Sequence, residues 1–287
     1  MFLIRKRLVW GGLSMNRWTT DEIKLLKELY PVTSKQEILN KMNRSWASIE
    51  NKARLLGISR KAKNKFFNEF YFDNIDTQEK AYWLGLIYSD GHVNQKYVCL
   101  SLKSDDGQHI INFAKDIKYK GSIYLNRDNN NYTSVEIRLS GEHITNIMQN
   151  RYCLKSGKTF TVKMPFDFIS EDLLVHFIRG YFDGDGSISK RSNNSWRVAI
   201  IGNKEFLEEL QNYIISKINI SQTKIYRASR KRDDLFTFEI GGSFKTYLFL
   251  EWLYKNANRK LERKYLKYLQ MKEEFEHLHR NYKGVKL

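Results

Sequence analysis

An apolar segment that ends in Asp-Gly occurs twice in the chain, and this repeat constrains the fold more than any other feature. Residues 81–91 read Ala-Tyr-Trp-Leu-Gly-Leu-Ile-Tyr-Ser-Asp-Gly, and residues 175–186 read Val-His-Phe-Ile-Arg-Gly-Tyr-Phe-Asp-Gly-Asp-Gly. Other landmarks recur with them, namely Tyr124 with Glu136 and Tyr226 with Glu239. Small changes of offset are what loop insertions produce, so each copy is predicted to be one subdomain of a common architecture.

Apolar periodicity and turn residues predict the order helix, two strands, helix, two strands, helix in each copy. The predicted strands are 97–102, 122–125 and 132–139 in the first copy, and 196–201, 224–227 and 235–240 in the second. The fold class is therefore α+β, with two pseudo-symmetric αββαββα subdomains built on antiparallel sheets. We place them at residues 79–170 and 171–287, the second ending in an additional helix.

A small all-α domain is predicted at residues 17–60, where apolar residues recur at helical spacing in three short stretches. Its pattern, W-T-x-x-E followed by R-S-x-x-S-I-x-x-K-A-x-x-L-G-I, resembles a Myb/SANT-like or helix-turn-helix module. The alternative is a three-helix protein-interaction domain. The outward face of the third helix offers side chains that reach phosphates and base edges in DNA: Ser48, Asn51, Lys52 and Arg54.

The charge distribution also indicates a polyanionic partner. Residues 1–65 hold fifteen Lys and Arg against five Asp and Glu, a net +10 of the +17 of the whole chain. Residues 61–78 are predicted to be a basic linker. Residues 1–16 are either a basic arm that reaches a DNA groove or a mis-assigned start, the true start then being Met15.

Other classes of protein are disfavoured by the composition. The two cysteines, Cys99 and Cys153, form no C-x-x-C, and we interpret both as small buried side chains. No apolar run is long enough to span a membrane, and the first residues do not have the pattern of a signal peptide. We expect a cytoplasmic protein encoded by a bacterium or a phage.

The repeated helices predict a site where their ends meet. Each has small residues four apart, Gly85 with Ser89 and Gly180 with Gly184, which let two helix backbones approach closely. Side-by-side packing about a pseudo-twofold axis brings Asp90 and Asp185 together. Two adjacent carboxylates repel each other unless a cation lies between them, and oxygen ligands favour Mg²⁺ or Mn²⁺. Such metals activate water in phosphodiester cleavage.

Both repeated segments resemble the two motifs of single-chain LAGLIDADG homing endonucleases, over about residues 79–270. The resemblance implies saddle-shaped sheets that lie in the DNA major groove, a long asymmetric target and staggered cleavage. The family's metal ligand is the last acid before the glycine, so Asp90 and Asp185 are the predicted ligands and Asp183 is interpreted as structural. We assign Gly91 and Gly186 to the same metal site. A basic residue near each centre is also implied, with Lys158 and Lys264 as candidates.

The predicted activity is site-specific, metal-dependent cleavage of double-stranded DNA by a monomer, as in intron homing. Two alternatives remain on the same scaffold. One is a splicing maturase that binds intron RNA. The other is a non-cleaving DNA-binding regulator, which predicts loss of one or both motif acids, whereas both are present here.

Overall fold

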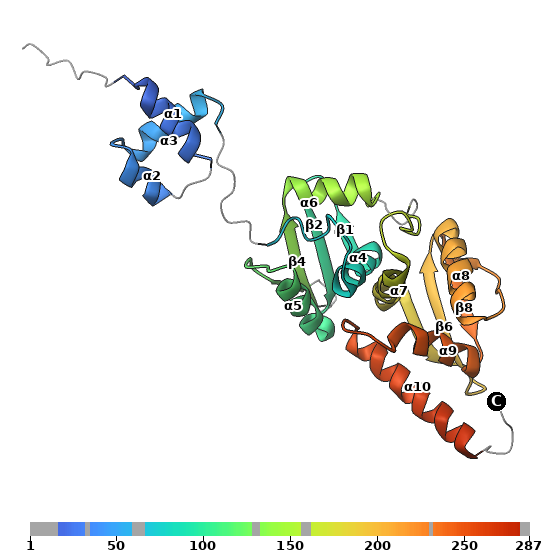
Figure 1. Ribbon diagram of the computed structural model, residues 1–287. Coiled ribbons are helices and arrows are strands. Elements are labelled where there is room, and N and C mark those ends of the chain that lie inside the picture. Colours follow the sequence, from blue (N-terminus) through green and yellow to red (C-terminus); the bar gives the residue numbers. More distant parts are fainter. Residues whose placement is uncertain are drawn as a thin grey trace, which may run out of the picture. The chain divides into compact units, whose positions relative to one another are not determined.

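Figure 1 shows the computed structural model of the chain, which describes residues 17–31, 35–58, 67–127, 133–155, 162–229 and 232–281. Its contacts divide the chain into two compact units, Met1–Lys65 and Phe66–Leu287. Each unit has a hydrophobic core of its own. The predictions for residues 1–16, including the start at Met15, concern residues outside the described part of the chain.

The first unit contains the predicted helices α1 (Thr20–Leu29), α2 (Lys35–Lys41) and α3 (Trp46–Leu55). Its buried core consists of residues that recur at helical spacing on these helices and just beyond them: Leu26, Tyr30, Ile38, Met42, Ile49 and Ala53. The chain leaves α3 through Gly57, whose φ of +66° favours glycine.

A charged contact joins the start of α1 to the turn before α3. The Thr19 hydroxyl and the Glu22 carboxylate form a capping box at the helix N-terminus. Arg44 then donates from Nε and Nη2 to the two oxygens of Glu22, each at 2.9 Å. This pairing with Arg44, together with the backbone hydrogen bond from Thr19, lowers the pKa of Glu22 to about 2. The acid and the arginine of the sequence pattern thus meet in space.

The first copy of the repeat forms a four-stranded antiparallel sheet in the order β1-β2-β4-β3. The strands are β1 (Gly91–Val93), β2 (Tyr97–Lys103), β3 (Tyr124–Arg127) and β4 (Thr133–Ser140). The helices are α4 (Gln78–Asp90), α5 (Gly107–Asp116), which follows the 3-10 turn Ser104–Asp106, and α6 (Glu142–Asn146), which continues as the π-helical turn Ile147–Arg151.

The second copy has the same strand order, β5-β6-β8-β7, again antiparallel. Its strands are β5 (Gly186–Lys190), β6 (Trp196–Gly202), β7 (Tyr226–Ser229) and β8 (Arg232–Gly241). Its helices are α7 (Glu171–Asp185), α8 (Lys204–Ile218), α9 (Ser243–Tyr254) and the additional α10 (Glu262–Asn281). The α+β class and the element order are confirmed. The strand predictions missed β1 and β5, which begin directly after the repeated helices.

Two predictions differ from the structure. Residues 61–78 were expected to be a linker, but Phe67, Tyr71 and Phe72 are buried in the core of the second unit, and Ile75 pairs with Ile169. The three lysines of the segment all precede Phe67, and burial of the aromatic rings that follow them outweighs the linker character suggested by the lysines. Cys99 is buried as expected. Cys153 is exposed instead, and its own backbone has a φ of +55°.

The segment between α9 and α10 and the first turn of α10 tie the second copy to the first. Arg259 donates from Nε and Nη2 to the two oxygens of Asp116, both at 2.7 Å. Asp116 also accepts from the indole of Trp83 at 2.7 Å. Arg263 reaches Asp106 at 2.9 Å. These contacts join the two subdomains through the acids at the two ends of α5, Asp106 and Asp116.

None of the helices in the described part of the chain is both long and apolar enough to cross a membrane.

Candidate active site

The repeated helices α4 and α7 lie side by side between the two sheets (Figure 1). A Cβ atom added at Gly85 would lie 2.0 Å from the Phe177 carbonyl oxygen, and one added at Gly180 would lie 1.9 Å from the Tyr82 carbonyl oxygen. Neither position has room for any side chain. The predicted backbone-to-backbone approach of the two helices is therefore present in the structure.

The close approach continues to the C-terminal ends of both helices. A Cβ atom at Gly184 would lie 1.9 Å from the Ser89 hydroxyl oxygen and 2.7 Å from Oδ2 of Asp90. The Asp90 carboxylate thus lies against the last turn of α7, one residue before Asp185. The pKa of Tyr181 is raised well above its ordinary value by burial first, and then by the charges of Asp185 and Asp90. Both carboxylates therefore act on the same hydroxyl.

The chain turns sharply from each helix into a strand at the glycine after the motif acid. Gly91 donates its backbone N–H to Ile87, and Gly186 donates to Phe182. A Cβ atom would lie 2.5 Å from the Ile87 carbonyl oxygen at Gly91, and 2.4 Å from the Phe182 carbonyl oxygen at Gly186. These turns hold Asp90 and Asp185 at the corner between helix and sheet, where a helix C-terminus also favours a cation.

Lys264 contacts the end of α7 from α10. It is 3% exposed, and its ammonium donates to the carbonyls of Phe182, Asp183 and Gly184 at 2.6, 2.7 and 3.2 Å. Burial lowers its pKa to about 8, against the opposing effects of Asp183, Asp90 and Asp185. The lysine donates to carbonyls of the last turn of the helix and adds positive charge beside the two motif acids.

Asp183 is fully buried and accepts three hydrogen bonds. They come from the hydroxyls of Tyr82 and Tyr254 at 2.7 and 2.6 Å and from the backbone N–H of Leu261 at 2.7 Å. Burial raises its pKa despite these partners. In the first copy, Tyr88 stands at the equivalent position and donates to the Tyr152 carbonyl at 3.0 Å. Both residues tie a motif helix to a later loop, which agrees with the structural reading of Asp183.

The remaining candidates lie elsewhere. Lys158 falls outside the described residues. On α3, Asn51 and Arg54 are exposed, and Ser48 and Lys52 are half-buried. Arg54 donates to the side chain of Asn51 at 3.3 Å. These four residues lie in the first unit, so they are not part of the site formed by α4 and α7.

The donor set at the helix ends consists of oxygens. Among the described residues, no group of three or more His, Cys, Asp or Glu is arranged to hold a metal ion. A cation there would bind the two carboxylates and complete its shell with carbonyls or water, which suits Mg²⁺. The sequence did not single out Tyr181, although its position four residues before Asp185 places it on the same helix face.

Residues 172–251 match a family of LAGLIDADG-like domains. The replication factor C small subunit of Methanocaldococcus jannaschii is 28% identical to this chain over 176 residues. The aligned part is 56% of this chain and 9% of that protein. An uncharacterized protein of Listeria innocua is 36% identical to this chain over 69 residues. The aligned part is 22% of this chain and 30% of that protein. The chain thus aligns with less than a third of the length of either relative.

The solved structures that resemble this chain include the LAGLIDADG homing endonuclease I-GzeII in complex with its DNA target. That alignment has a TM-score of 0.49 at 10% identity and covers 72% of this chain and 93% of the other. They also include the N-terminal LAGLIDADG domain of DUF199/WhiA, with a TM-score of 0.43 at 18% identity, covering 70% of this chain and 92% of that domain.

Proposed function

We propose that the protein is a site-specific endonuclease that hydrolyses double-stranded DNA with a divalent metal bound between Asp90 and Asp185. The single observation that carries this proposal is the convergence of the two motif acids at the ends of helices in backbone contact. The two carboxylates come from two copies of one repeat, as cleavage of the two strands of a duplex requires. The net charge of +17 of the chain favours a polyanion such as DNA.

Each residue of the site has a role in the proposed reaction. Asp90 and Asp185 would hold Mg²⁺ or Mn²⁺, with Gly91 and Gly186 shaping the turns that present them. A metal bound there would supply Lewis acidity toward the phosphate and the activation of water. Lys264 holds the end of α7 in place and contributes positive charge near the scissile phosphate. Lys158 is proposed for the corresponding place in the first copy.

The first unit is proposed to be a helix-turn-helix-like DNA-binding module. Its third helix presents Asn51 and Arg54 to solvent, and the pair suits contacts to phosphates and base edges. This module adds affinity and register on the DNA, whereas the chemistry stays with the second unit.

The experiment is plasmid cleavage. The substrate is a supercoiled plasmid that carries the intron-free sequence flanking the gene, or a sequence selected from randomised duplex DNA. We expect double-strand cutting in Mg²⁺ by the unchanged protein, and loss of cutting with retained DNA binding for Asp90→Asn and Asp185→Asn. Glu208→Gln, on the exposed surface of α8, is the control for removing one negative charge.

The outcomes separate the three functions. Full double-strand cutting by either Asp variant contradicts the assigned site. Tight, specific DNA binding without cutting in Mg²⁺ or Mn²⁺ identifies a regulator. Preferential binding to intron RNA, with splicing in its presence, identifies a maturase.

A further inference from the structure

The two sheets each have a glutamate on the face turned away from the core helices. Along β4, Ile137 and Leu139 are buried in the core while Glu136 and Arg138 point the other way, and along β8 Ile240 is buried while Glu239 points outward. Glu136 and Glu239 are the repeated acids of the two copies. A negative charge on this face opposes binding of a polyanion, so the presence of a glutamate in both copies must have a function other than contacting the polyanion.

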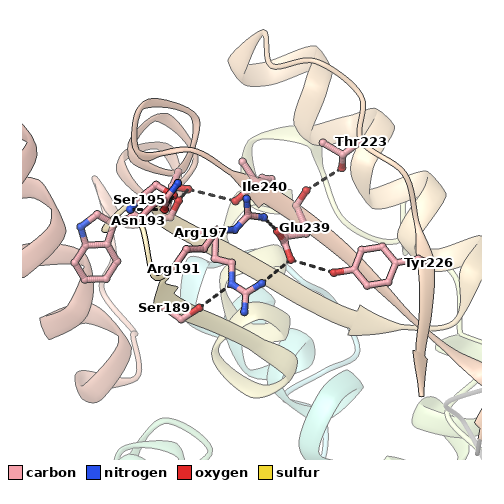
Figure 2. Close-up of polar contacts among 11 residues, drawn as sticks. Ser189, Arg191, Asn193, Ser195, Arg197, Thr223, Tyr226, Glu239 and Ile240 are labelled. Atoms are coloured by element: carbon pink, nitrogen blue, oxygen red, sulfur yellow. Dashed lines mark hydrogen bonds and ion pairs between the residues drawn. The ribbon is translucent and has the colours of Figure 1, made fainter. Parts of the chain in front are cut away.

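In the second sheet, Glu239 holds two arginines (Figure 2). Arg191, in the β5–β6 turn, pairs through Nη2 with one carboxylate oxygen. Arg197 donates from Nη1 to the other oxygen at 3.1 Å, and from Nε to the Ser189 hydroxyl at 3.1 Å. The Tyr226 hydroxyl donates to the same carboxylate at 3.0 Å.

The first sheet has a related arrangement with one arginine. Arg138 pairs through Nε with Glu136, and Asn126 donates to the second oxygen of that carboxylate at 3.3 Å. The guanidinium carbon of Arg138 lies 5.3 Å from the ring centre of Tyr97 and 5.7 Å from that of Tyr124. Tyr124 is the repeat counterpart of Tyr226.

The arginines come from different strands in the two halves. In each sheet the glutamate is followed, two residues later on the same strand, by the residue of the next cross-strand pair on that face. In the first sheet this pair is Cys99 on β2 with Arg138 on β4. In the second sheet it is Arg197 on β6 with Gly241 on β8, so the equivalent pair contains an arginine in both sheets, on opposite strands. At Gly241 a Cβ atom would lie 3.1 Å from Nη2 of Arg191, so the second arginine fills the space left by the missing side chain.

The glutamates and the arginines differ in their access to a ligand. The side chains of Glu136 and Glu239 are 11% and 13% exposed, whereas those of Arg138, Arg191 and Arg197 are between 41% and 49% exposed. A guanidinium has five N–H donors, so each arginine retains donors after pairing with its glutamate. The carboxylates are thus shielded by the groups that they orient, and the arginines face outward.

We propose that Arg138, Arg191 and Arg197 read guanines in the DNA target, and that Glu136 and Glu239 are positioning residues for them. Arginine recognises guanine through two parallel hydrogen bonds to O6 and N7 in the major groove. The half-site on the second sheet contains guanines at neighbouring base pairs, because its two arginines share one carboxylate. The half-site on the first sheet contains one such guanine. This inference rests on the proposed function and gives its target an asymmetry in guanine content.

The test is selection from randomised duplex DNA by the full-length protein in Ca²⁺, followed by sequencing. We expect Arg138→Ala, Arg191→Ala and Arg197→Ala each to lower the preference for guanine at one position about tenfold. Glu239→Gln is expected to lower it at both positions of one half-site, because the amide replaces one accepting oxygen with an NH₂ donor and removes the negative charge that holds both arginines. Glu208→Gln removes the same charge on α8 and is expected to leave every position unchanged.

Several results distinguish failure of this inference from failure of the proposed function. If the unchanged protein selects no common sequence, or prefers RNA to duplex DNA, the proposed function fails together with the inference. If a common sequence appears but no guanine responds to the arginine variants, the base-reading role is wrong. If the arginine variants behave as expected and Glu239→Gln matches Glu208→Gln, the positioning role alone is wrong. Equal melting temperatures of the Gln variants exclude a merely structural effect.

Discussion

Replacing Gly180 with alanine tests the contact between the two motif helices. The added Cβ would lie 1.9 Å from the Tyr82 carbonyl oxygen, and real Cβ contacts are essentially never shorter than 3.0 Å. Because the clash is with backbone, the helices must separate by about 1 Å. Overpacking of this kind costs ~3 kcal/mol, the upper part of the usual range. Alanine recovers about 1 kcal/mol through its higher helix propensity, which leaves a net loss of ~2 kcal/mol.

A loss of ~2 kcal/mol lowers the Tm by roughly 4–8 °C for a unit of this size. Circular dichroism during heating measures that change. The same displacement moves Asp90 away from Asp185, and a misplacement of about 1 Å can reduce the rate 100-fold. At 25 °C the variant is still folded. We therefore expect its cleavage rate to fall by far more than the fraction of unfolded protein can explain.

The control is Gly141→Ala, since a Cβ there finds its nearest neighbour at 3.6 Å and the backbone is extended. Because alanine is a poorer N-cap than glycine but restricts the unfolded chain, its Tm is expected to stay within about 2 °C. The double variant Gly85→Ala with Gly180→Ala is expected to lose much less than the sum, because one separation relieves both clashes. A Gly180→Ala protein that melts and cleaves like the unchanged protein would refute the reasoning.

Three further predictions concern buried and exposed polar groups. Asp183→Asn places an amide N–H against donors and is expected to cost about 1–3 kcal/mol in urea unfolding, whereas Asp185→Asn costs little. Burial lowers the pKa of His109 to about 4, so the stability it contributes above pH 6.5 is lost as the pH falls toward 4; His109→Gln should flatten that decline in urea midpoints. Lys52→Ala with Arg54→Ala is expected to weaken DNA binding and make its salt dependence shallower in filter binding, and an unchanged slope contradicts a DNA-binding role for α3.

Local patterns were sufficient to predict the helix pair. Each segment has small residues four apart, Gly85 with Ser89 and Gly180 with Gly184, which lets the two helices touch. Both segments are apolar on nearly all sides, which required their burial. The meeting of Asp90 and Asp185 followed from the repeat alone, because two copies of one unit pack about an axis that brings equivalent residues together.

Other features depended on partners far away in the sequence. Asp183 is stabilised by Tyr254 and Leu261, more than 70 residues further on, and no local pattern connects them. The burial of Phe72 was not predicted, because the lysines at the start of residues 61–78 indicated a basic linker. Lys264 was chosen by resemblance, whereas its three carbonyl contacts became evident only once α10 was placed against α7.

The bridge from Arg259 and Arg263 to Asp116 and Asp106 affects how such a chain can recombine. An exchange of subdomains with a relative, cut at residue 170, would separate each arginine from its acid and leave the buried Trp83 beside an unneutralised carboxylate. The first subdomain is thus complete only with a short piece of the second. A chimera that moves residues 258–263 together with residues 79–170 keeps the bridge intact, so the boundary at which the halves can be exchanged is discontinuous along the chain.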